Sequence, residues 1–127
     1  MAINLKEGIS SIVEITVEEK DTAIIYGSGD LEVLATPVMI GLMEKASKIC
    51  VTPYLEEETT TVGIGIDIKH LKATPLKMKV RSEATLYKVD GKKLFFNVQA
   101  WDEKGTIGEG THVRYIVNSK KFMEKLK

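Results

Sequence analysis

The chain has 127 residues, of which 43% are apolar, and its 18 basic and 18 acidic side chains give a formal net charge of +0 at pH 7. This size and composition predict one folded domain over residues 1–127, and the balanced charge argues against nucleic acid or an anionic membrane as a partner. The single cysteine, Cys50, excludes an intrachain disulfide. Residues 1–8 lack the apolar segment of a secretory signal, so we expect a cytoplasmic protein with no membrane span.

The first part of the chain carries a strand signal. Apolar and polar residues alternate over residues 9–17, which predicts a β-strand. Residues 22–26 are expected to extend this strand or to form a short second one. The glycine-rich residues 27–30 then supply a flexible turn before the pattern changes to a helical period.

A long amphipathic helix is predicted from Thr36, because threonine is a favourable N-cap and Pro37 suits the first helical position. The apolar stripe that should pack on a sheet consists of Met39, Leu42, Met43, Ala46, Ile49 and Cys50. Glu44 lies at the edge of this stripe, where periodicity alone allows a functional carboxylate or a surface ion pair with Lys48. Gly41 is costly inside a helix and indicates a close approach to the backbone on the same side.

The rest of the chain predicts four consecutive antiparallel strands. They cover residues 61–69, 76–86, 94–100 and 106–117, with turn signals at residues 90–91 and 102–105. Asn118 and Ser119 can cap a short C-terminal helix. The order of strand, long helix and four strands predicts an α+β fold with one helix on a five-stranded antiparallel sheet. Since one helix cannot cover such a sheet, we expect a second copy to pair with it.

Few residues suggest chemistry by themselves. Neither His70 nor His112 belongs to a spacing that binds metal, so we expect no metal and no cofactor. His70 ends the long strand at the rim of the sheet, where a functional role or an ordinary exposed histidine are both possible. The pairs Gly63-x-Gly65 and Gly108-x-Gly110 lie inside strands and indicate bulges or close approaches rather than a nucleotide-binding loop.

Three separated segments agree in order and spacing with one known family. They are Ala-Thr-Pro-Val-Met-Ile-Gly-Leu-Met-Glu at residues 35–44, residues 63–70 followed by Ala-Thr-Pro at 73–75, and Gly-Glu-Gly-Thr-His-Val-Arg at 108–114. From residue 35 to its end, the chain resembles the fluoroacetyl-CoA thioesterase-like branch of the hot-dog thioesterases. The resemblance implies a hot-dog fold and a homodimer, or a tetramer, that hydrolyses a short or medium acyl-CoA to the free acid and CoA.

The same resemblance assigns roles to five residues. It implies that Thr36, Glu44 and His70 are catalytic, that Gly63 lines the substrate site, and that Arg114 supports it. Glu44 would act as nucleophile or as general base, His70 would orient or activate its partner, and Thr36 would donate a hydrogen bond. These residue types alone do not choose between nucleophile and base.

The sequence departs from the family in two places. Pro37 stands where the family has glycine, which removes one possible backbone donor for an oxyanion. Residues 26–36 are short and lack the phenylalanines of the family's lid, so selectivity for fluoroacetyl-CoA is not expected. The candidate walls of the acyl site are then Leu31, Val33 and Leu34.

Two rival functions remain open at this level. A hot-dog hydratase or dehydratase also pairs a histidine with a carboxylate over an acyl thioester. A noncatalytic acyl-CoA-binding module could use the same fold, because fold does not fix function. Release of free thiol from acyl-CoA distinguishes hydrolysis from both.

Overall fold

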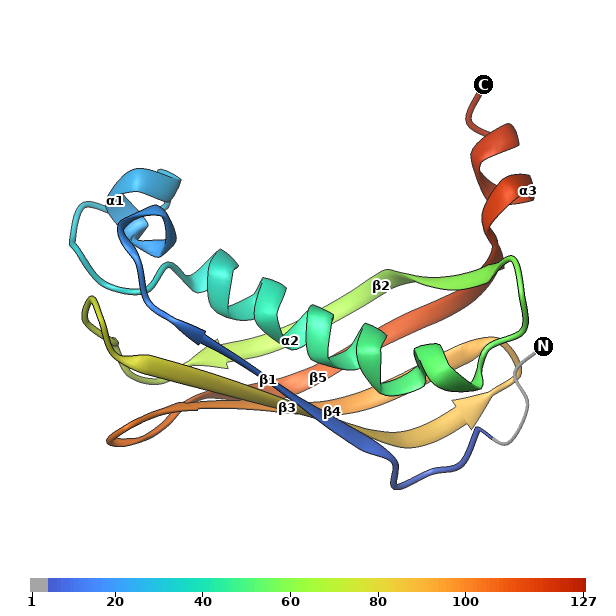
Figure 1. Cartoon of the computed structure of the whole chain (residues 1–127), viewed down its shortest axis with the longest axis horizontal. Helices are drawn as coiled ribbons and strands as arrows, with labels where there is room; N and C mark the ends of the chain where they lie inside the picture. The colour runs from blue at the N-terminus through green and yellow to red at the C-terminus, as the bar shows by residue number, and fades with distance from the viewer. Residues whose placement is uncertain (1–4) are drawn as a thin grey trace.

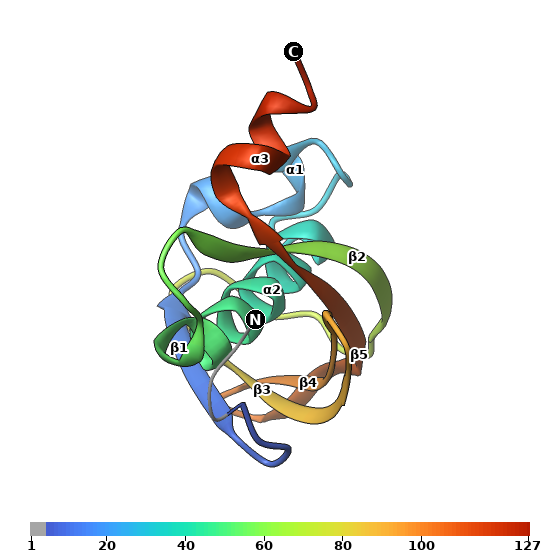
Figure 2. The ribbon, with the colours of Figure 1, turned by 90° about the vertical axis from the view of Figure 1, so that its right-hand side faces the viewer.

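In the computed structural model, which describes residues 5–127, one long helix lies across the concave face of a five-stranded antiparallel sheet (Figure 1). Seen toward one end of the molecule, the sheet curls around this helix (Figure 2). Residues 1–4, which belong to the segment expected to lack a secretory signal, lie outside the described residues. The predicted α+β arrangement is confirmed, and no helix in the described residues is long and apolar enough to cross a membrane.

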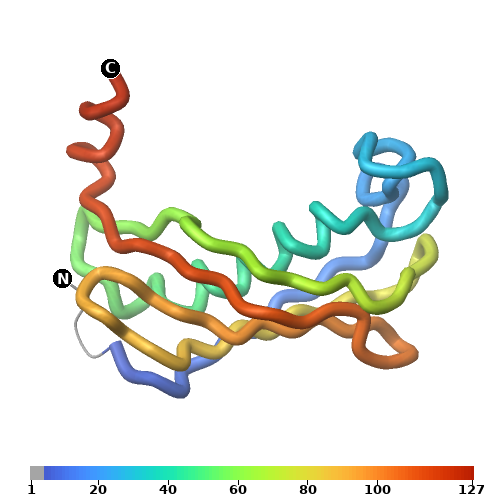
Figure 3. Tube along the Cα trace, turned by 180° about the vertical axis from the view of Figure 1, so that it is seen from behind, coloured from blue at the N-terminus to red at the C-terminus, as the bar shows by residue number. Residues whose placement is uncertain are grey.

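The sheet has the order β1-β3-β4-β5-β2, and all neighbouring pairs are antiparallel. The strands are β1 (Ser10–Thr16), β2 (Thr59–His70), β3 (Lys79–Asp90), β4 (Lys93–Asp102) and β5 (Gly105–Asn118). The helices are α1 (Ala23–Tyr26), α2 (Thr36–Val51) and α3 (Ser119–Glu124), with 3-10 turns at Glu19–Asp21 and Thr52–Tyr54. Within the described chain β2 pairs only with β5, so β2 forms one free edge of the sheet (Figure 3).

The core lies between α2 and the sheet. From the predicted stripe, Met39, Leu42, Met43, Ala46 and Cys50 are buried. They pack against apolar side chains that the strands present on alternate positions, such as Leu86, Leu94 and Phe96. Each fully buried large side chain contributes about 1.5–3 kcal/mol. Ile49, also predicted on the stripe, is instead 39% exposed.

Two details of α2 differ from prediction. Ala35 is the N-cap and Thr36 is already the first helical residue, so the Thr36 hydroxyl does not cap the helix and is available elsewhere. A Cβ placed on Gly41 meets nothing within 4 Å among the described residues, so the expected close approach does not occur within this chain. Burial raises the pKa of the Cys50 thiol, against an opposing hydrogen bond to the Leu86 backbone, and a thiol with a raised pKa is a poor nucleophile.

The strand predicted for residues 22–26 is wrong, because these residues form the short helix α1. The Thr22 side chain accepts a hydrogen bond from the Ile25 backbone N–H at 3.5 Å and serves as the N-cap. Gly27 ends the helix in the left-handed conformation at φ 96°. α1 and the loop after it therefore stand beside the first turn of α2 (Figure 1).

The sequence predicts bulges or close approaches at the glycines of β2 and β5, and both features are present. The pairing of β2 with β5 shifts register between Gly63 and Gly65, which is the signature of a bulge. A Cβ on Gly110 would clash with the backbone carbonyl of Asp67, so only glycine fits where these strands approach. The bulge changes which side chains of β2 face α2.

A buried carboxylate fixes the loop that follows β2. Asp102 accepts hydrogen bonds from Thr74 Oγ1 at 2.9 Å, Lys72 Nζ at 3.3 Å and the Lys104 backbone N–H at 2.7 Å. Burial acts to raise the pKa of Asp102, but these bonds and the Lys72 charge outweigh it and hold that pKa below its usual value. The chain just beyond His70 is thus anchored to the far end of β4.

Candidate active site

A cavity of about 320 Å³ opens at the N-terminal end of α2, between the loop after α1 and the loop after β2. It is lined by Ala23, Ser28, Val33, Leu34, Thr36, His70, Leu71, Lys72 and Ala73. Of the predicted acyl-site walls, Val33 and Leu34 line this cavity, whereas Leu31 is 70% exposed and does not. Its walls combine aliphatic side chains such as Val33 and Leu34 with polar groups such as Thr36 and His70, as expected of a small-molecule site.

Thr36 and His70 meet at this cavity. Thr36 Oγ1 lies 2.7 Å from His70 Nδ1, although the two residues are 34 positions apart in the chain. The first turn of α2 supplies the hydroxyl, and the last residue of β2 supplies the imidazole. A hydroxyl in hydrogen-bond contact with an imidazole is the arrangement in which either group can be activated for proton transfer.

The environment of His70 favours a neutral ring. Burial lowers the pKa of His70, while the nearby backbone of Lys72 acts in the opposite direction. Its Nε2 atom is buried and has no hydrogen-bond partner among the residues that the structure describes. An unpaired buried nitrogen is costly, and active sites are where such groups are retained for a ligand or a reacting proton.

Glu44 lies in a second cluster, over Gly63 of β2. A Cβ placed on Gly63 would stand 3.1 Å from Glu44 Oε2, 3.1 Å from His112 Cε1 and 3.6 Å from Arg114 Nη1. Any side chain at residue 63 would therefore crowd Glu44 and His112 and come into contact with Arg114. The glycine keeps open the space in which a carboxylate, an imidazole and a guanidinium converge.

Arg114 is held rigidly in this second cluster. Its Nε donates to Thr61 Oγ1 at 2.7 Å, its Nη2 donates to the Thr61 carbonyl at 2.9 Å, and its Nη1 donates to His112 Nε2 at 3.1 Å. Arg114 is only 7% exposed. Burial lowers the pKa of Arg114, and the negative charge of Glu44 opposes that shift.

The predicted site residues thus form two groups. Thr36 lies with His70, and Glu44 lies with Gly63 and Arg114. Glu44 follows Thr36 by eight residues on α2, which separates their backbones by roughly 12 Å along the helix axis. One chain by itself does not bring the carboxylate to the Thr36–His70 pair.

Sequence reasoning assigned no role to His112, which is fully buried beside Arg114. The signal that was available is its spacing: residues two apart on a strand share a face, so His112 must point the same way as Arg114. Its main-chain partner, the carbonyl of Gly65, is 47 residues away, and no local pattern reveals it.

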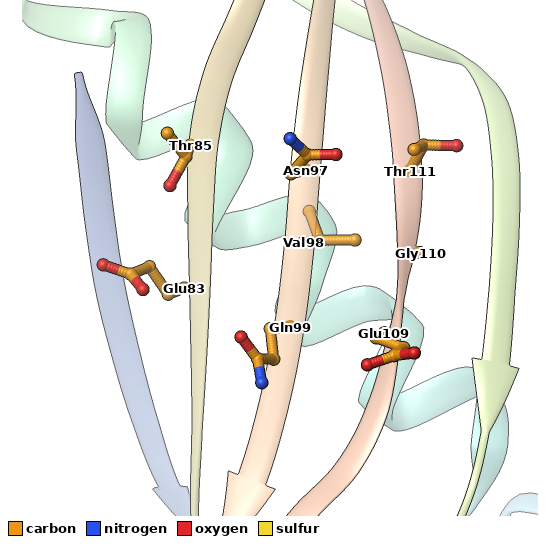
Figure 4. Close-up of a pocket in the computed structure, with 8 residues that line it drawn as sticks. All are labelled: Glu83, Thr85, Asn97, Val98, Gln99, Glu109, Gly110 and Thr111. Carbon is orange, nitrogen blue, oxygen red and sulfur yellow. The ribbon is translucent and has the colours of Figure 1, made fainter. Parts of the chain in front are cut away.

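A different hollow, of about 390 Å³, lies on the opposite face of the sheet. Figure 4 shows the polar side chains that β3, β4 and β5 present there, on the side away from α2. Its lining consists of Glu83, Thr85, Asn97, Val98, Gln99, Glu109, Gly110 and Thr111. None of the predicted site residues lines this hollow.

Comparison with known proteins identifies the family of the chain. A family model described as fluoroacetyl-CoA-specific thioesterase matches residues 17–120. A fluoroacetyl-CoA thioesterase from Streptantibioticus cattleyicolor is 40% identical over 96 residues, which are 76% of this chain and 69% of the relative.

Solved structures give the same result. The fluoroacetyl-CoA thioesterase FlK matches with a TM-score of 0.91 at 32% identity, covering 97% of this chain and 96% of that one. Variants of it have been solved with acetyl-CoA and with fluoroacetate and CoA. A Thermus thermophilus thioesterase superfamily member matches with a TM-score of 0.89 at 28% identity, covering 96% and 90% of the two chains. The chain belongs to the fluoroacetyl-CoA-specific thioesterase family, and it is an acyl-CoA thioester hydrolase with a hot-dog fold.

Proposed function

We propose that this enzyme hydrolyses short or medium acyl-CoA thioesters at a site shared by two copies of the chain in a homodimer. The observation that carries the proposal is the 2.7 Å contact between Thr36 Oγ1 and His70 Nδ1 at the mouth of a cavity lined in part by aliphatic side chains. A cavity of about 320 Å³ accommodates a short or medium acyl group together with the thioester. The acyl chain enters between Val33, Leu34 and Leu71.

The free edge of β2 supports the shared site. This strand leaves Ile64 and Ile66 52% and 44% exposed, and an uncovered edge of this kind pairs readily with a second copy. In an antiparallel pair centred on β2, His70 of one copy lies opposite Thr59 of the other. Gly63 of that other copy is then about 13 Å along the strand from His70, whereas Gly63 of the same copy is about 23 Å away.

The catalytic roles follow from the chemistry of the thioester. A thiol with a pKa near 8.5 leaves readily, so the reaction needs a nucleophile and a stabilised oxyanion more than a strong acid. Glu44 of one copy attacks the carbonyl carbon or activates water toward it. The Thr36–His70 pair of the other copy donates to the developing oxyanion and moves the proton. Arg114, beside Glu44, orients the bound thioester.

A panel of acyl-CoAs tests the proposed substrate class. Each acyl-CoA, from two to about sixteen carbons, is incubated with enzyme, free thiol is followed with a trapping dye, and products are analysed by mass spectrometry. We expect stoichiometric free acid and CoA, with the highest kcat/KM among the short or medium chains. Products in which only a double bond has been hydrated or formed, without free CoA, would contradict hydrolysis.

A second experiment separates the two roles of Glu44. Under single-turnover conditions in water labelled with oxygen-18, an anhydride formed by Glu44 leaves the label in the protein, in the peptide that contains this residue, when water attacks the Glu44 carbonyl of the anhydride. If Glu44 acts as base toward water, the label appears in the free acid in the first turnover. Label in the Glu44 peptide therefore identifies the anhydride, because a base mechanism never places solvent oxygen in the protein.

A further inference from the structure

His112 occupies an unusual place for an imidazole. It lies in β5 with its side chain turned into the core, is 0% exposed, and its ring stacks on Phe96 with centroids 6.3 Å apart and planes 29° apart. Buried histidines must have both ring nitrogens satisfied, or they destabilise the fold. The contacts of the two nitrogens therefore define what the ring does.

These contacts fix one protonation state and one tautomer. Nδ1 lies 2.7 Å from the backbone carbonyl of Gly65, which only accepts, so Nδ1 carries the hydrogen. Nε2 faces Nη1 of Arg114 at 3.1 Å, and a guanidinium only donates, so Nε2 must offer its lone pair. The ring is neutral. Burial and the Arg114 charge keep its pKa lowered, against the opposing effects of the Gly65 carbonyl and Glu44.

The Glu44 carboxylate is a second acceptor near the Arg114 guanidinium, and its negative charge acts on the pKa of Arg114. Thr61 binds Nε and Nη2 of Arg114 on one side, and His112 binds Nη1 on the other. Glu44 Oε2 and His112 Cε1 lie equally close, at 3.1 Å, to the position that a Cβ on Gly63 would occupy. Without the His112 lone pair, one N–H of Nη1 would lose its acceptor, and the guanidinium, then held only by Thr61, would be free to shift toward the carboxylate and form an ion pair that weakens Glu44 as nucleophile or base.

We propose that His112 is a positioning residue of this thioesterase: its neutral Nε2 holds Arg114 Nη1 and so keeps the guanidinium from closing onto Glu44. The role rests on the proposed function of Glu44 and Arg114. Among the described residues His112 hydrogen-bonds to Gly65 and Arg114 and not to Glu44, so it acts through the orientation of Arg114.

Two variants separate this role from mere packing. In His112→Asn the amide N–H can still donate to the Gly65 carbonyl, but the side chain is too short to accept from Arg114. In His112→Gln the longer side chain places a carboxamide oxygen near the position of Nε2. We expect His112→Asn to lower kcat about tenfold to a hundredfold, the effect of one lost hydrogen bond to a charged group, with little change in KM. His112→Gln should stay within about fivefold of wild type.

A double-mutant cycle tests whether His112 acts through Arg114. In an Arg114→Gln background, His112→Asn should lower kcat by less than about threefold further, because the group that it positions is gone. Additive losses, or equal losses for His112→Asn and His112→Gln at equal melting temperature, would overturn the proposal. Both of these contradicting outcomes can be recognised whether or not the substitutions of Glu44 or Arg114 themselves reduce activity.

A spectroscopic measurement needs no enzyme activity and no substitution of His112. The chain has only two histidines, so nitrogen-15 spectra of the imidazoles can be assigned with one His70→Gln sample. We expect His112 in wild-type enzyme to be neutral with its proton on Nδ1 from pH 6 to 8. A protonated ring, or a proton on Nε2 at pH 7, overturns the proposal. If the tautomer is as expected but no acyl-CoA is hydrolysed, the proposed function fails and the geometry stands.

Discussion

Adding one methyl group at Gly63 should disable the site without unfolding the protein. The Cβ of Gly63→Ala would stand 3.1 Å from Glu44 Oε2 and 3.1 Å from His112 Cε1, which is closer than such atoms normally approach. Gly63 is not among the glycines with positive φ, so alanine is compatible with the backbone there. The neighbour free to move is the Glu44 side chain, because His112 is bonded on both nitrogens.

The magnitude follows from that displacement. A shift of a reacting group by several tenths of an ångström up to about 1 Å costs about tenfold to a hundredfold in turnover. Alanine also reduces the entropy of the unfolded chain, by about 0.4–1 kcal/mol relative to glycine, which offsets the tight contact. We therefore expect kcat/KM to fall at least about tenfold, while the melting temperature moves by only a few degrees.

The assay is CoA release followed with a thiol-trapping dye, together with thermal unfolding followed by circular dichroism. Gly41→Ala is the matched control, because a methyl group at this position of α2 meets nothing within 4 Å. This substitution should keep kcat/KM within about threefold of wild type, and it should stabilise the protein by about 1 kcal/mol because alanine favours the helix more than glycine does. Gly110→Ala is the opposite control and should abolish folding, because its Cβ strikes the Asp67 carbonyl. Wild-type kcat/KM in Gly63→Ala would refute the placement of Glu44 beside Gly63.

Further predictions concern catalysis, pH and selectivity. Glu44→Ala and His70→Ala should each lower kcat at least about a hundredfold, and Thr36→Ala should lower it less; near-normal turnover in Glu44→Ala contradicts the role of the carboxylate. Because burial lowers the pKa of His70, kcat/KM should persist as pH falls and decline only below about 6.5; a decline centred above that value contradicts a neutral, buried His70. Aliphatic walls discriminate by only about 1–3 kcal/mol, so fluoroacetyl-CoA should not be preferred to acetyl-CoA by more than about a thousandfold, and side-by-side kcat/KM values decide this.

Periodic features of the sequence predicted the fold well. The four strands after α2 are 10 to 14 residues long, and apolar and polar side chains alternate along them. Alternation over that length arises because one face of the sheet is buried, so it identifies strands well. The strand predicted from Thr22 to Tyr26 was wrong because this segment is too short for periodicity to distinguish a strand from a helix. There the Thr22 cap and the left-handed Gly27 set a helical turn that outweighs the β-propensity of its isoleucines.

The site was less accessible to sequence reasoning. The segments that carry Thr36, Glu44 and His70 pointed to a site, and helix geometry gives the roughly 12 Å between Thr36 and Glu44, but nothing local in the sequence says which of these two residues His70 contacts. His112 was overlooked because its contacts with Gly65 and Arg114 arise from strand pairing and a bulge. Long-range contacts of this kind have no local signature in a single sequence.

The central claim, that two copies share the active site, is tested most directly by mixing two inactive variants. His70→Ala and Glu44→Ala are prepared separately, combined in equal amounts, and exchanged through mild denaturation, with the mixed dimer verified by native mass spectrometry. Random exchange makes half of the dimers mixed, and each mixed dimer contains one site with intact His70 and intact Glu44. We predict recovery of about 25% of wild-type kcat per chain, as expected for a two-fold symmetric dimer with shared sites. No recovery despite verified exchange, or a chain that remains monomeric and active, would contradict the account.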